Sequence, residues 1–127
     1  MTRLAVTSIA LHFLLAAPLF AQQETGTADA AVLRGLDRVN GVVNDVTVPA
    51  GATVNIGTLA LTMAECRYPL DNPSGDAYAH LVISQPDQEA PIFDGWMVAS
   101  SPALNPLEHS RYDVWVLRCA IAKTSTE

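Results

Sequence analysis

The sequence predicts an all-β domain, a compact sandwich or partly open barrel of six to seven mostly antiparallel strands with one short helical turn. Two observations predict this class. Short apolar segments are separated by Gly, Pro and Asn, which is typical of strands joined by tight turns. Residues 58–63 also alternate strictly, with Leu59, Leu61 and Met63 on one face and small or polar residues on the other. We therefore expect one face of this strand to lie in the core.

The first residues of the chain predict export. Arg3 precedes an apolar run from Leu4 to Phe20, and polar residues follow Ala21. This pattern is typical of a signal peptide that is cleaved after Ala21. A membrane anchor is the alternative, but the run falls short of the roughly 20 residues that span a bilayer. We therefore expect no membrane insertion after signal cleavage.

The part of the chain after the predicted signal peptide is long enough for one domain and too short for two. Residues 22–30 are small and polar, which predicts a flexible arm rather than packed structure. The expected organisation is thus a signal peptide, an arm, a single β domain and a short tail, at residues 1–21, 22–30, 31–122 and 123–127.

Turn residues and alternation place the strands at residues 31–39, 42–48, 53–56, 58–65, 77–84, 91–98 and 112–121. Asn40-Gly41 predicts a type I′ hairpin turn between the first two strands, because both central residues of that turn need positive φ. Pro49-Ala50-Gly51 predicts the next turn. Gly57 indicates a kink or bulge between the two strands beside it.

The two cysteines, Cys66 and Cys119, are expected to form a disulfide in an oxidising compartment. Two buried free thiols or a catalytic thiol are the alternatives. Cys119 is expected to share one side of its strand with Trp115 and Leu117. Cys66 has the opposite parity to the apolar residues of its strand, so we expect a β-bulge near Ala64-Glu65 to turn it inward.

Two stretches lack strand periodicity. Residues 67–76 are rich in Pro, Asn and Asp, which predicts a surface loop. Residues 99–110 predict one helical turn over residues 101–107, with Ser101 as the N-cap and Pro102 at the first helical position.

The charge of the chain excludes some partners. Seven Lys and Arg stand against thirteen Asp and Glu, a formal net charge of −6. Nucleic acid and anionic lipid are therefore not expected as partners, because both are bound through clustered cations. The negative net charge is expected to keep the protein soluble. The alternative is that it forms an acidic surface that binds a basic partner.

Candidate catalytic residues are Ser100, Ser101, His109 and Asp113, the residue types of nucleophilic acyl transfer. No Gly-x-Ser-x-Gly sequence surrounds either serine. We therefore assign no catalytic residue and keep a small exported hydrolase as an alternative.

No metal site or cofactor is predicted. Beyond the leader only His80 and His109 remain as histidine ligands, and the cysteines are expected to bond each other. Residues 71–76 resemble a calcium loop only superficially, because Pro73 stands at a ligand position. His80 alternates with apolar neighbours, which favours a structural role.

Trp96 and Met97 are the strongest candidates for a contact surface, although Trp96 and Trp115 are also typical core residues. Gly95 allows close backbone approach, and Trp with Met suits an adaptable interface.

The tract from Gly95 to Asn105, together with Leu107-Glu108-His109 and the segment from Tyr112 to Cys119, resembles a small secreted bacterial family named domain of unknown function 2155. The similarity runs from about Val32 to Cys119. It implies export in Gram-negative bacteria, hence the periplasm, and the pair of cysteines. It implies no activity, but it directs attention to residues 96–109. The candidate binding residues are Trp96, Met97, Ser100, Ser101, Leu104, Asn105, Glu108 and His109.

These observations favour a non-enzymatic periplasmic β module that binds a protein of the cell envelope. The hydrolase and a barrel that encloses a small apolar ligand are the two alternatives.

Overall fold

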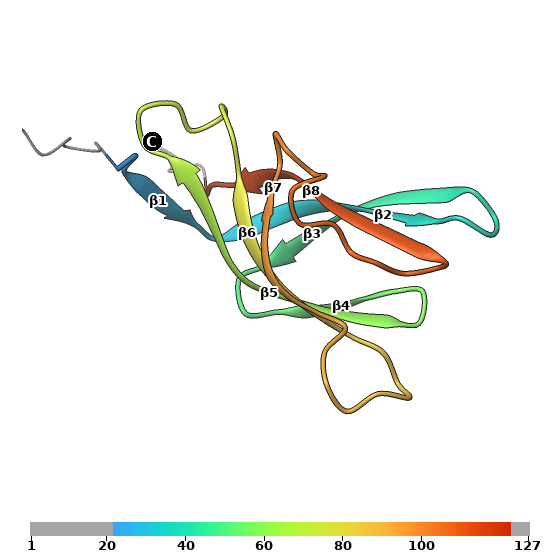
Figure 1. The fold of residues 1–127 in the computed structure, drawn as a ribbon. Coiled ribbons are helices and arrows are strands. Elements are labelled where there is room, and N and C mark those ends of the chain that lie inside the picture. The colour runs from blue at the N-terminus through green and yellow to red at the C-terminus, as the bar shows by residue number, and fades with distance from the viewer. Residues whose placement is uncertain (1–21, 123–127) are drawn as a thin grey trace, which may run out of the picture.

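The computed structural model describes residues 22–122 and confirms the all-β class. Eight strands form two antiparallel sheets that face each other without closing into a barrel (Figure 1). The described part contains no helix, and so none that could cross a membrane. The predicted signal peptide and C-terminal tail lie outside the described residues.

The larger sheet has five strands. β5 (Leu59–Pro69), β6 (Tyr78–Ser84) and β7 (Phe93–Val98) follow one another in space as they do in the chain. Two short strands share the other edge of β5: β4 (Thr53–Ile56) pairs with its first half and β1 (Thr25–Ala28) with its last four residues.

The smaller sheet has three strands, in the order β3-β2-β8. β2 (Ala30–Asp37) is central, with β3 (Val42–Pro49) on one side and β8 (Tyr112–Ala120) on the other. The core lies between the two sheets. Its largest fully buried side chains alternate along the strands, as period-two burial requires: Leu33, Leu59, Leu61, Met63, Leu81 and Ile83.

β1 lies within residues 22–30, which were expected to form an arm. Residues 25–28 pair with residues 66–69 of β5, and Ala28 is buried at 3% exposure. At Asp29 the chain leaves the larger sheet, and it enters the smaller one at Ala30. The polar composition of this stretch hid a strand that is stabilised by backbone pairing rather than by apolar side chains.

The predicted hairpin at Asn40-Gly41 is present, but the predicted turn type is wrong. Asp37 and Val42 are the last paired residues, so the turn has four residues, and only Gly41 has positive φ, at 73°. The Gly41 N–H donates to the Asp37 carbonyl at 2.8 Å, and the Val42 N–H donates to the Asn40 side chain at 2.9 Å. Both bonds stabilise a turn of four residues rather than two. In particular, the Asn40 side chain accepts the N–H of Val42, as Asn side chains commonly do in turns.

The disulfide between Cys66 and Cys119 is confirmed, with a Cα–Cα distance of 5.8 Å. The predicted bulge in β5 is also present, as a register shift between Met63 and Glu65. It turns Cys66 into the core, where the residue is fully buried. The sulfur bridge therefore joins the larger sheet to the smaller one.

A second bulge, at Leu117 in β8, was not expected. Leu33 pairs with Val116 and Val32 with Arg118, which leaves Leu117 without a partner. This shift brings Cys119 inward. The expectation that Trp115 shares its side is wrong, because Trp115 precedes the bulge and faces outward, between the buried Val114 and Val116.

The predicted helical turn at residues 101–107 is absent. The Leu104 N–H donates to the Ser101 carbonyl at 3.1 Å, which makes a single β-turn. Pro106 has no N–H with which to continue a helix, and the Asn105 side chain bonds to β7 instead. The predicted loop at residues 67–76 is also shorter than expected, because β5 continues to Pro69.

Candidate functional site

The outer face of the larger sheet carries a group of aromatic and charged side chains from three adjacent strands. His80 of β6 pairs with Trp96 of β7, and Arg67 of β5 pairs with Tyr78 of β6. Strand parity places these four residues on the side away from the core, because their neighbours Cys66, Ala79, Leu81 and Met97 are buried. We name Arg67, Tyr78, His80 and Trp96 the Trp96 surface.

Trp96 is fixed within this surface while 39% of it stays exposed. The His80 ring stacks on its indole at 5.3 Å between centroids and 24° between planes. The Arg67 guanidinium lies over the indole, with Cζ 5.6 Å from the centroid, which is within the range of a cation–π contact. The indole is therefore held in place without being covered.

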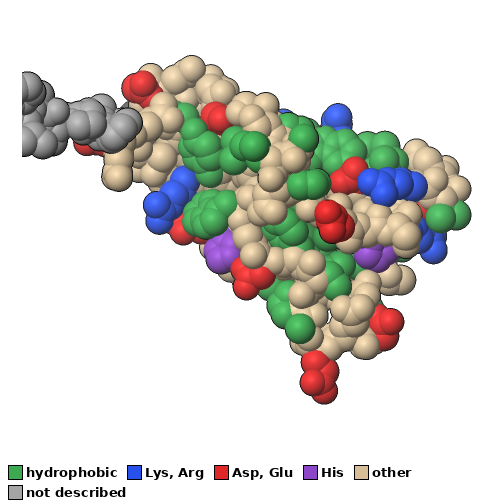
Figure 2. Space-filling view, in the orientation of Figure 1, with side chains coloured by type: hydrophobic (Ala, Val, Ile, Leu, Met, Phe, Trp, Pro, Cys, Tyr) green, Lys and Arg blue, Asp and Glu red, His purple; other side chains and the backbone are tan. Residues whose placement is uncertain are grey.

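Two carboxylates fix the partners of Trp96. Glu65 Oε1 accepts from Arg67 Nε at 2.6 Å, and Asp94 Oδ1 lies 2.8 Å from His80 Nε2. Figure 2 shows hydrophobic surface at this face bordered by cationic, acidic and histidine side chains. The Trp96 surface thus combines an apolar centre with a charged rim, the usual anatomy of an interface.

A shallow depression of about 500 Å³ lies beside Trp96. Arg67, Tyr78 and the first described residues of the chain line it, and the Tyr78 hydroxyl donates to Gln23 Oε1 at 3.3 Å. A partner side chain could enter here and contact the indole.

The predicted binding residues separate into different environments. Trp96 lies on the outer face, whereas Met97 is buried at 4% exposure and belongs to the core. Leu104 is 75% exposed at the tip of the following loop, and Glu108 is also exposed. Asn105 Nδ2 donates to the Trp96 carbonyl at 3.1 Å and so holds this loop against β7.

Ser100 and Ser101 begin the same loop. The Ser100 hydroxyl donates to Asp76 Oδ2 at 2.7 Å, and its N–H donates to Asp76 Oδ1 at 3.0 Å. Ser101 is partly buried, and its N–H donates to the Val98 carbonyl at 3.1 Å. Ser100 therefore fastens the start of this loop to the segment before β6, and Ser101 closes the turn that follows β7.

The hydrogen bonds of His109 do not connect it to either candidate nucleophile, Ser100 or Ser101. Its Nδ1 accepts from the N–H groups of Arg111 and Tyr112, both at 3.0 Å, and its Nε2 lies 3.2 Å from Gln85 Oε1. Among residues 22–122 no hydrogen bond joins His109 to Ser100 or Ser101. A serine hydrolase with a histidine base needs a histidine nitrogen free to take the serine proton, so this geometry does not support the proposed Ser/His/Asp set.

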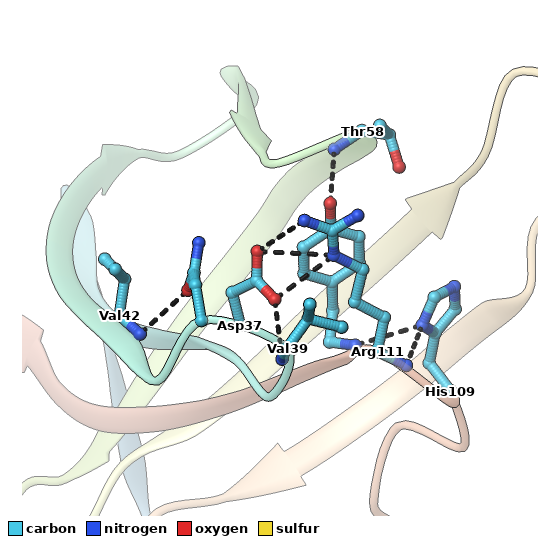
Figure 3. A network of polar contacts seen from close by, with 8 residues as sticks. Asp37, Val39, Val42, Thr58, His109 and Arg111 are labelled. Atoms are coloured by element: carbon cyan, nitrogen blue, oxygen red, sulfur yellow. Dashed lines mark hydrogen bonds and ion pairs between the residues drawn. The ribbon is translucent and has the colours of Figure 1, made fainter.

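His109 instead belongs to a network at the far end of the sandwich (Figure 3). Arg111 donates to both carboxylate oxygens of Asp37, with Nε–Oδ1 at 3.1 Å and Nη2–Oδ2 at 2.9 Å. The side-chain hydrogen bond from Arg111 is the main reason why the pKa of Asp37 lies below its ordinary value. The network ties the start of β8 to the hairpin of β2 and β3, which is a structural role.

Asp76 offers a test of these contacts by pH. Burial disfavours its charged form, but the hydrogen bonds from the Ser100 side chain and from the N–H groups of Ala77 and Ser100 outweigh burial and lower its pKa. Because the pKa of Asp76 is lower in the folded state, the ionised carboxylate stabilises the fold when the pH is above the ordinary pKa of 3.8. This contribution is lost as the pH falls through the folded-state pKa. We expect Asp76→Asn to cost about 1 kcal/mol at neutral pH, because the carboxylate is partly solvated.

Thermal melting of the two proteins from pH 7 to pH 2 measures this effect. The difference in Tm between wild type and Asp76→Asn should shrink as the acid protonates Asp76. A difference that stays constant over the whole range would contradict the assignment.

Sequence patterns indicate only part of the Trp96 surface. Residue type singles out Trp96 as a candidate, whereas composition places Arg67 in a loop and alternation favours a structural role for His80. The alternation of Tyr78 and His80 with buried residues was the available signal, because it places both on the solvent face. Among the described residues, no group of three or more His, Cys, Asp and Glu side chains is arranged to hold a metal ion.

Comparison with known proteins gives a family but no activity. The chain is 25% identical over 87 residues to "Uncharacterized protein RP359" of Rickettsia prowazekii (strain Madrid E). The aligned region covers 66% of this chain and 56% of that protein. No solved structure shows a significant match. The family model described as "Uncharacterized protein conserved in bacteria (DUF2155)" matches residues 31–119, which include the disulfide and Trp96. The chain therefore belongs to the DUF2155 family, as the tract around Trp96 predicts.

Proposed function

We propose that this protein is a non-enzymatic, exported β module that binds a protein of the bacterial envelope through the Trp96 surface. The observation that carries the proposal is the indole of Trp96, 39% exposed on the outer face of the larger sheet and held by two side chains. Tryptophan, tyrosine and arginine are the residues enriched at the energetic centres of protein interfaces.

The fixed position of Trp96 favours binding. An indole held by His80 and Arg67 loses little conformational freedom when a partner covers it, so more of the contact energy appears as affinity. Glu65 pairs with the Arg67 guanidinium and Asp94 lies within hydrogen-bond distance of the His80 ring, so the polar groups of this surface already have partners, which limits the desolvation cost.

The location in the periplasm is supported by the predicted leader and by the disulfide. A bond between Cys66 and Cys119 is consistent with an oxidising compartment, since cytosolic thiols are kept reduced.

The test uses the two tryptophans of the chain as a matched pair, because each faces outward from a different sheet. A photoreactive amino acid replaces Tyr78, beside Trp96, in cells that express the full-length protein. We expect a specific protein adduct after irradiation. Trp96→Ala should reduce its yield at least tenfold, whereas Trp115→Ala should leave it unchanged.

Melting curves of both alanine variants control for folding. An adduct that persists in Trp96→Ala, or that is lost equally in both variants, would overturn the proposal. The same cells, fractionated, report whether the protein is in the periplasm.

A further inference from the structure

β3 has the one long, regular free edge among the strands of residues 22–122. It pairs with β2 along all eight residues without a register shift, and no described residue pairs with its other edge. It contains no Lys, and its proline is the last residue. Natural sheets usually protect such an edge, since unpaired N–H and C=O groups attract another strand.

The other edges of the two sheets are protected. β1 and β4 have four residues each. β8 carries the bulge at Leu117, and the Trp96 carbonyl of β7 is bonded by Asn105. The contrast marks the β3 edge as a place where a further strand can add.

The inward side of β3 is also uncovered near the hairpin. A slot of about 240 Å³ lies between β3 and β4, lined by Val42, Asn44 and Val46 on one side and by Asn55 and Ile56 on the other. On this inward side Val42 is 48% exposed, and on the outer face Val43 is 50% exposed. A strand added to β3 would cover part of both side chains.

The sequence of β3 selects the added strand, because the three inward-facing residues outside the buried core, Val42, Asn44 and Val46, are symmetric about Asn44. An antiparallel pairing of two copies centred on Asn44 places Val42 opposite Val46 and Asn44 opposite Asn44. On the outer face it places Val43 opposite Asp45, whose charge is already paired with Arg34 at 2.7 Å. If the pairing were centred on Asp45, the Asp45 carboxylates of the two copies would face each other. If it were centred on Val43, the apolar Val42 would face the polar Asn44.

We propose that two copies of this chain associate through their β3 edges, antiparallel and centred on Asn44, to form a continuous six-stranded sheet. The same surface meets itself about a two-fold axis, the commonest symmetry of protein dimers. The contact is small compared with the roughly 1,200 Å² of stable interfaces, so the dimer forms and dissociates with concentration. It leaves the Trp96 surface, on the other sheet, free to bind.

Sedimentation velocity over a wide concentration range tests the proposal, with the disulfide-bonded protein purified from cells that express the full-length chain. We expect a monomer–dimer equilibrium. Asn44→Asp and Asn44→Lys should each weaken association at least tenfold, because like charges then face each other on the two-fold axis. A mixture of the two variants should regain the dimer, since opposite charges then meet.

Asn72→Asp, in a distant exposed loop, makes the same charge change and should associate like wild type. Melting curves show whether the variants fold. A wild-type protein that stays monomeric at every concentration overturns the proposal. So does a dimer that is insensitive to Asn44→Asp, or a mixture that fails to restore association.

Discussion

Removal of the disulfide is expected to lower the free energy of unfolding by about 4 kcal/mol, because the bond between Cys66 and Cys119 closes a loop with a sequence separation of 53. The loop holds β5 to β8, so the unfolded chain loses much of its conformational freedom when it is closed. Since folded domains are stable by only about 5–15 kcal/mol, the loss is a large part of the total. Urea unfolding of a Cys66→Ser, Cys119→Ser double variant measures it.

Reduction of the wild-type protein provides the matched control. Under reducing conditions its stability should approach that of the double variant, while the double variant itself should not respond to the reductant. A loss of less than about 1 kcal/mol would indicate that the reduced, unfolded chain keeps structure that already holds the two cysteines together.

Gly57→Ala is expected to cost about 3 kcal/mol. Gly57 has φ of 58°, a backbone conformation that costs other residues about 1–2 kcal/mol. A Cβ atom at this position would also overlap the ring of Tyr112 in β8, so the turn between β4 and β5 would have to move away. The Tyr112 hydroxyl accepts from the Thr58 N–H at 3.4 Å, and this link between the sheets would be lost as well (Figure 3).

Gly51→Ala separates the two effects. Gly51 has φ of 81°, but nothing lies within 4 Å of its would-be Cβ. Gly51→Ala should therefore cost only the penalty of the left-handed backbone conformation, about 1–2 kcal/mol. Equal losses for Gly51→Ala and Gly57→Ala in chemical denaturation would show that the contact with Tyr112 contributes nothing.

Turn residues and alternation together predict seven of the eight strands, and the alternation is clearest in β5 and β6, where buried Leu, Met and Ile residues alternate with less buried ones. β1 escapes such a prediction, since its four residues are small and its pairing with β5 depends on a segment about 40 residues away. The two bulges show the same division. The bulge in β5 is predictable because Cys66 conflicts with the parity of its strand, whereas the one at Leu117 leaves an apolar pattern that looks regular.

The candidate site is predictable to a similar extent. Trp96 stands out by residue type, but Arg67 contributes to the same surface only because β5 continues beyond the point where its alternation ends. Met97 shows the opposite error. It is adjacent to Trp96 in sequence, yet a strand turns successive side chains to opposite faces, so it packs in the core.

The position of Cys119 sets the order of events during maturation. It lies in β8, the last described strand, while its partner lies in β5. The covalent link can therefore be made only after the described strands have been synthesised as far as Cys119. A product truncated before β8 has no intramolecular partner for Cys66, so its thiol stays available to a second molecule.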